Sequence, residues 1–135
     1  MKIKWDIFNL FDGMINIEKS YRACDRALDA LKKYRENPKA FEDPEKKAEM
    51  DETIDEAIKA AKKIVSLEGK KNWPGVFREM HKNLANIYIG LGMFDEARSE
   101  IEKLKEFGEV GRQDAEEVSQ KLEQEQKTEE TASGA

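Results

Sequence analysis

Apolar residues recur three or four positions apart along most of this 135-residue chain. This spacing puts them on one face of an α-helix. The longest stripe consists of Ile3, Ile7, Leu10, Met14, Ile17, Tyr21, Cys24, Leu28 and Leu31. It predicts one long helix that ends near Tyr34. Asp12-Gly13 is the point at which this helix could kink or divide in two, because glycine is a poor helix former. The stripe keeps its register across Asp12-Gly13, which favours one continuous helix.

Proline, glycine and acidic residues mark the ends of the next helices. Asp43-Pro44-Glu45 has an N-cap residue, a proline at the first helical position and an acid in the first turn. It predicts a second helix that stops at Gly69, a residue type common at helix C-termini. Asn72-Trp73-Pro74 opens a third helix, which Gly92 ends, and a fourth begins near Asp95. So short a link forces the third and fourth helices into an antiparallel hairpin.

The last segment has a thinner apolar stripe. A fifth helix is predicted from Arg112 to about residue 124, and residues 125–135, which contain no large apolar side chain, are predicted to be a disordered polar tail. The stripes expected to be buried in the second to fifth helices are Met50, Ile54, Ala57, Ile58, Ala61, Ile64 and Val65; Trp73, Phe77, Met80, Leu84, Ile87, Tyr88 and Leu91; Ala97, Ile101, Leu104 and Phe107; and Ala115, Val118 and Leu122. The chain is therefore predicted to be a single all-α domain of about five helices over residues 1–124.

Composition excludes several classes of function. The chain has 24 basic and 29 acidic residues and a net charge of −5, which argues against nucleic acid as the main partner. No apolar run approaches the roughly 20 residues of a membrane span, and nothing resembles a secretory signal. The single cysteine, Cys24, falls on the apolar stripe of the first helix and is expected to be a buried side chain rather than a reactive thiol. A cytoplasmic location is expected.

One stretch, residues 78–111, resembles a tetratricopeptide-repeat (TPR) unit. Leu84, Tyr88 and Ala97 match the repeat pattern, Ala85 replaces its glycine, Ile101 its phenylalanine and His81 its tryptophan, and Glu109 stands where its final proline would be. The resemblance implies an antiparallel hairpin stack in which Ala85 and Ala97 sit at a close helix crossing. It also implies that residues 112–124 form a capping helix. Residues 54–64 carry a weaker echo of the pattern in the second helix.

The resemblance points to a candidate partner-binding groove on the third helix. Glu79, Lys82, Asn86 and Ile89 recur at helical spacing on the side opposite its apolar stripe. In the TPR family the first helix of each hairpin lines the groove that holds peptides, and the pair Lys82 and Asn86 is similar to part of the set with which some members hold a C-terminal carboxylate. The alternative is a solvated helix face without a ligand.

The first helix carries a second candidate surface. Trp5, Phe8, Phe11 and Ile15 widen its apolar stripe beyond what one hairpin covers. They are interpreted as core, as a self-association surface of a homodimer or, least favoured because flanking basic residues are few, as a helix lying on a membrane surface.

No arrangement of residues predicts catalysis or a cofactor. His81 is the only histidine, so neither a His-based dyad with a second histidine nor a di-metal helical bundle with two Glu-x-x-His motifs can be assembled. We therefore expect a non-enzymatic interaction or scaffold module without a metal or cofactor. The alternative is a structural subunit that self-associates through its first helix.

Overall fold

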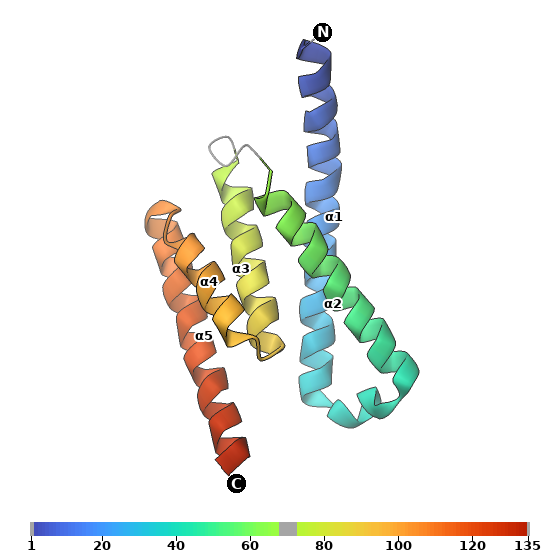
Figure 1. Cartoon of the computed structure of the whole chain (residues 1–135), viewed down its shortest axis with the longest axis vertical. Coiled ribbons are helices and arrows are strands. Elements are labelled where there is room, and N and C mark those ends of the chain that lie inside the picture. Colours follow the sequence, from blue (N-terminus) through green and yellow to red (C-terminus); the bar gives the residue numbers. More distant parts are fainter. Residues whose placement is uncertain (1, 68–72, 135) are drawn as a thin grey trace.

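The computed structural model of the chain describes the backbone of residues 2–67 and 73–134 and the side chains of residues 17–67 and 73–130. Over these residues the fold is all-α, as predicted, with five α-helices, one 3₁₀ helix and no strand. The elements are α1 (Lys2–Glu36), η1 (Pro38–Glu42), α2 (Pro44–Val65), α3 (Pro74–Gly90), α4 (Phe94–Leu104) and α5 (Gly108–Gly134). Figure 1 shows α3 between the α1/α2 pair on one side and the α4/α5 pair on the other.

The first helix is continuous. Its backbone stays helical through Asp12-Gly13, so the predicted preference for one helix is confirmed. Lys33 and Arg35 in its last turn complement the negative end of the helix dipole. The first turns of α1 extend past the ends of the other helices (Figure 1).

The α1/α2 hairpin is joined by an open connector. Asn37-Pro38 ends α1 and begins η1, and the Asp43 side chain caps α2 by accepting a hydrogen bond from the Glu45 N–H. Small residues are buried in both helices, with Ala27 and Ala57 fully buried, and the Ser20 hydroxyl of α1 donates to the Ala60 carbonyl of α2. The second helix ends at Val65; the predicted stop, Gly69, lies outside the described residues.

The α3/α4 hairpin is joined by a tight turn. Gly92 has a φ of +74°, a conformation that costs other L-residues about 1–2 kcal/mol. This turn brings the Met93 N–H to the Tyr88 carbonyl at 2.8 Å, so a carbonyl at the end of α3 is satisfied. Ala85 and Ala97 are both fully buried in the packed interior, as expected for a close crossing.

Most predicted core positions are buried; Ile58 in the middle of α2 is partly buried, and the exposed exceptions lie at helix ends. Trp73 is 41% exposed and Leu91 is 38% exposed, because they occupy the two cap positions of α3 rather than its packed middle. Phe107 follows the end of α4 and is partly buried. The predicted stripe of α5, formed by Ala115, Val118 and Leu122, is buried throughout.

The fifth helix is longer than predicted at both ends. It begins at Gly108 rather than Arg112, and it continues to Gly134, so residues 125–134 are helical where the sequence predicts a disordered tail. Glutamate, glutamine and lysine are good helix formers, and they make up half of this segment. Glu125 also forms an ion pair with Arg35 at the end of α1, which ties this part of α5 to the rest of the fold.

Candidate functional site

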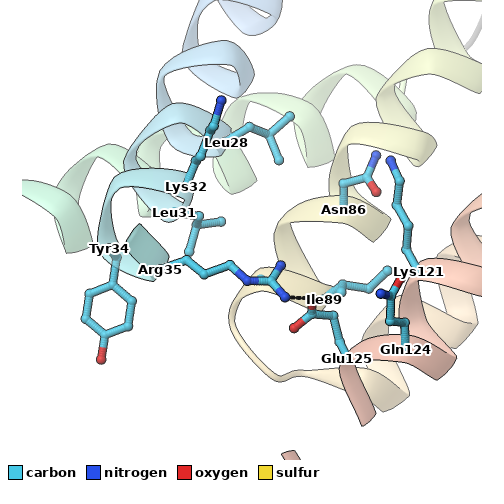
Figure 2. Close-up of a pocket in the computed structure, with 11 residues that line it drawn as sticks. Leu28, Leu31, Lys32, Tyr34, Arg35, Asn86, Ile89, Lys121, Gln124 and Glu125 are labelled. Carbon is cyan, nitrogen blue, oxygen red and sulfur yellow. Dashed lines mark ion pairs between the residues drawn. The ribbon is translucent and has the colours of Figure 1, made fainter. Parts of the chain in front are cut away.

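The main candidate site is a hollow between three helices that are not consecutive in the chain. It has a volume of about 450 Å³ and lies between the C-terminal half of α1, the end of α3 and the middle of α5 (Figure 2). Its lining residues are Leu28, Leu31, Lys32, Tyr34 and Arg35 from α1, Asn86, Ile89 and Gly90 from α3, and Lys121, Gln124 and Glu125 from α5. We call it the α1/α3/α5 groove.

The floor of the α1/α3/α5 groove is apolar. Leu28 and Leu31 are half-buried on α1, and Ile89 is buried on α3. Gly90 allows the two helices to approach, because a methyl group there would lie 2.8 Å from a Leu31 methyl carbon. An apolar floor of this kind can hold an aliphatic side chain of a partner.

The rim of the groove is polar. The Asn86 carboxamide is half-buried and makes no hydrogen bond to any residue that the structure describes, so its donors and acceptor are available to a ligand. Arg35 reaches across from α1 to form an ion pair with Glu125 on α5, while Tyr34 points away from the other labelled side chains (Figure 2). Lys32 and Lys121 place positive charge along the same rim.

The four residues predicted as a groove have different environments. Asn86 and Ile89 line the hollow, although Ile89, which has no evident core role in the sequence, is only 7% exposed and belongs to the hydrophobic core. Glu79 accepts a hydrogen bond from the Tyr21 hydroxyl on α1. Lys82 binds two carboxylates on α5, with its Nζ 3.2 Å from Asp114 and 2.9 Å from Glu117.

Lys82 is therefore a link between α3 and α5. Partial burial alone would lower the pKa of its ammonium group, but its hydrogen bonds to Glu117 and Asp114 and the charge of these carboxylates outweigh burial and raise that pKa. The buried Asp114 also pairs with Arg78, so one carboxylate contacts two cations of α3. A partner that bound Lys82 would have to displace these internal carboxylates.

Tyr21 and Cys24 connect α1 to α3. Burial and the hydrogen bond to Glu79 raise the pKa of the Tyr21 phenol well above its ordinary value. Burial, with a smaller effect of Asp25, raises the pKa of the Cys24 thiol to about 11, so at neutral pH this fully buried side chain is a thiol. The predicted role of Cys24 as a buried small side chain is confirmed.

The histidine lies in the α3/α4 hairpin, away from the groove. His81 is 8% exposed, its Nδ1 is 2.6 Å from an Oε of buried Glu100, and its ring is 5.8 Å from that of Phe107. Lys103 approaches the same Glu100 carboxylate at 3.5 Å. The structure therefore has a packed imidazole at this position.

Several groove residues were not foreseen from the sequence. Lys32 and Gln124 are polar residues on polar helix faces, and nothing in their spacing distinguishes them from other solvated positions. They meet Asn86 only because α1 and α5 pack on opposite sides of α3. The second predicted surface, Trp5, Phe8, Phe11 and Ile15, lies outside the described side chains.

Within the described part of the chain, no group of three or more His, Cys, Asp or Glu residues could hold a metal ion. None of the described helices is long and apolar enough to cross a membrane.

Comparison with protein-family models, with curated proteins and with solved structures found no significant match to this chain. Over the described residues the fold is a bundle of five packed α-helices.

Proposed function

We propose that this chain is a non-enzymatic protein-interaction or scaffold module with a TPR-like hairpin stack, and that it holds a peptide or protein segment in the α1/α3/α5 groove. The proposal rests on the presence of this groove. Three non-consecutive helices line an open hollow of about 450 Å³ with an apolar floor and a polar rim. Binding sites in proteins commonly combine such a floor with a few placed polar groups.

The order of the helices supports the TPR-like assignment. The helices α1, α3 and α5 are the first helices of successive hairpins, with α5 as a single terminal helix, and together they line the groove. This is the side on which TPR proteins, which the repeat pattern at residues 78–111 resembles, hold their peptides. The partner is expected to use an apolar side chain against Leu28, Leu31 and Ile89 and a polar group on Asn86.

The test is affinity capture from cell extract with the parent and with an Asn86→Ala/Lys121→Ala variant. Loss of the contact made by each of these two side chains is expected to weaken partner binding by about 1 kcal/mol. The double change should therefore lower partner recovery at least tenfold. A Ser99→Ala/Lys105→Ala variant, altered at exposed positions of α4 and the turn after it, is the matched control. Equal recovery by parent and groove variant, at equal helicity by circular dichroism, would show that the groove is not the binding site.

Lys82 is left unchanged in this variant for a structural reason. Its two carboxylate contacts hold α5 against α3, so Lys82→Ala would loosen the groove even if Lys82 never touches a partner. Reduced capture by that substitution would not separate a binding role from a structural one.

The alternative proposal is a structural subunit that self-associates through the first half of α1. The observation that favours it is the projection of the first turns of α1 beyond the other helices (Figure 1), in a segment whose sequence contains Trp5, Phe8, Phe11 and Ile15. Mass measurement in solution separates the two proposals. A dimer that Phe8→Glu converts to a monomer supports self-association, whereas a parent that is monomeric up to high micromolar concentration opposes it.

A further inference from the structure

A second hollow lies between α1 and α2 and does not involve α3, α4 or α5. It has a volume of about 320 Å³. Its lining residues are Lys19, Ser20, Ala23 and Arg26 from α1, Glu56, Lys59, Ala60, Lys63 and Ile64 from α2, and Leu67 just after α2. We call it the α1/α2 furrow.

The floor of the α1/α2 furrow is made of small and apolar residues. Ser20 and Ala23 are buried on α1, and Ala60 and Ile64 face them from α2. The Ser20 hydroxyl donates to the Ala60 carbonyl at 3.4 Å, so its proton is used within the hairpin. Small residues between two helices leave a groove into which the side-chain ridge of another helix can pack.

The rim of the furrow carries an excess of positive charge. Lys19 and Arg26 stand on the α1 side and Lys59 and Lys63 on the α2 side, against a single carboxylate, Glu56. The whole chain has a net charge of −5, whereas the residues that line this furrow carry a net positive charge.

The four cations of the rim are not paired within the hairpin. On other faces of α1 and α2 some basic side chains form ion pairs one turn away, as in Arg22–Glu18 at 2.6 Å, Lys33–Asp29 at 3.0 Å and Lys47–Asp51 at 3.5 Å. Lys19, Arg26, Lys59 and Lys63 form no ion pair with any residue that the structure describes. Among the lining residues, four positive charges therefore stand against one negative charge, without a direct ion pair to any described residue.

The spacing of the cations matches a helix better than a small anion. Lys19 and Arg26 are two turns apart on one edge, and Lys59 and Lys63 are one turn apart on the other. A helix lying in the furrow would bring acidic side chains to both edges and an apolar stripe to the floor between them, the arrangement by which flanking charges select a partner in helix pairs. A small anion would need buried donors at the floor, where Ala23, Ala60 and Ile64 offer only carbon.

A neighbouring hollow extends this surface along the hairpin. It has a volume of about 390 Å³, shares Arg26 with the furrow, and is floored by Ala30, Phe41 and Met50. Leu67, at the opposite end of the furrow, is 44% exposed and adds an apolar contact there. The distance from Lys46 to Leu67 along α2 is on the order of 30 Å, enough for several turns of a docked helix.

From this charge and shape we infer that the α1/α2 furrow binds an acidic amphipathic helix of a partner protein. Its glutamate or aspartate side chains would pair with Lys19, Arg26, Lys59 and Lys63, and its apolar stripe would contact Ala23, Ala60 and Leu67. This inference does not depend on the proposed function of the α1/α3/α5 groove, because the two hollows share no lining residue.

The probes are two synthetic 18-residue helices with the same leucine stripe, one with glutamate and one with glutamine at the polar positions. The full chain is labelled with ¹⁵N and titrated with each peptide at low salt. The glutamate peptide is expected to bind at least tenfold more tightly and to shift the amide signals of Ala23, Ala60, Ile64 and Leu67. Its affinity is expected to fall at least tenfold between 50 and 500 mM salt, because exposed charge pairs are screened.

The test variant is Lys59→Glu/Lys63→Glu, which is expected to lower affinity for the glutamate peptide at least tenfold. The matched control is Lys39→Glu/Lys62→Glu, which changes the net charge equally at exposed positions outside the furrow and is expected to lower affinity less than threefold. Asn86→Ala, in the other groove, is expected to have no effect.

Four outcomes would overturn the inference. The first two are equal affinity for the glutamate and glutamine peptides, and an equal loss of affinity in the test and control variants. The other two are amide-signal shifts confined to Asn86 and Ile89, and the same shifts of the furrow signals when inorganic phosphate alone is added. Furrow signals that move with protein concentration in the absence of peptide would assign the site to a second copy of the chain instead.

Discussion

The two hairpins of this protein are built by different means. The α1/α2 hairpin joins helices of 35 and 22 residues through an open connector that contains η1. The α3/α4 hairpin joins helices of 17 and 11 residues through a turn that depends on Gly92 in the left-handed conformation. One hairpin is long and loosely joined, and the other is short and tightly joined.

The same contrast appears in their polar contacts. The α3/α4 hairpin encloses a buried pair, His81 and Glu100, whose side chains satisfy each other. The α1/α2 hairpin leaves a furrow edged by cations that form no ion pair with any described residue. The short hairpin thus satisfies a buried polar pair internally, whereas the long hairpin leaves charged groups on its surface.

The largest effect is expected from overpacking the short hairpin. Ala97→Trp places a large ring where Ala97 is fully buried and should lower the free energy of unfolding by about 1–3 kcal/mol or more. Ala48→Trp, at an exposed position of α2, is the control and should change it by less than about 0.5 kcal/mol. Urea titration of both variants measures the difference, and equal midpoints for Ala97→Trp and parent would contradict a close crossing of α3 and α4.

A smaller effect is expected from the turn that distinguishes the two hairpins. Gly92→Ala forces an alanine into a φ of +74° and should cost about 1–2 kcal/mol. Gly75→Ala is the matched control, since a Cβ there meets nothing within 4 Å, and it should be neutral or slightly stabilising. If thermal melts rank the two variants in the opposite order, the tight turn is not what holds the short hairpin in register.

Alkaline pH is expected to weaken the attachment of the long hairpin to the short one. The pKa values of Tyr21 and Cys24, which face α3 from α1, are both raised in the folded protein, the second from 9.0 to about 11. Between pH 9 and pH 11 the Cys24 thiol keeps its proton in the folded protein and loses it in the unfolded chain. The stabilisation from this group is therefore fully present below about pH 9 and falls as pH rises towards 11.

The measurement is urea unfolding at pH 7 and pH 10. Cys24 alone should account for a loss on the order of 1 kcal/mol at pH 10, and Cys24→Ala should remove that part of the loss. An unfolding free energy that does not change between pH 7 and pH 10 would argue against a protonated, buried Cys24.

The smallest effect is expected at the end of α5, which touches both hairpins. Deleting residues 126–135 keeps the ion pair of Glu125 with Arg35 and removes only exposed or half-buried positions among the described side chains. Stability should therefore change by less than about 0.5 kcal/mol. A loss of more than about 1 kcal/mol in thermal melts would show that the last turns of α5 support the Gly92 turn, beside which Glu129 lies.

The sequence by itself determined the helices and most of the core. The start of α2 at Asp43-Pro44, the Gly92 turn and the buried stripe of α5 all follow from spacing and capping, because a helix is set by contacts within a few residues along the chain. The end of α5 was missed because Glu, Gln and Lys favour both a solvated helix and a disordered tail, and the ion pair with Arg35 is a contact between distant parts of the chain.

Only the tertiary structure decided the environments of individual polar residues. Lys82 and Asn86 lie one turn apart on the same helix and look alike in the sequence, yet Lys82 is engaged by carboxylates of α5 while Asn86 lines an open groove. Lys59 and Lys62, three residues apart, likewise differ in that only Lys59 lines the furrow beside α1. The reason is physical: helical spacing determines which residues share a face, but whether that face meets a partner helix, a hollow or water depends on how the helices pack.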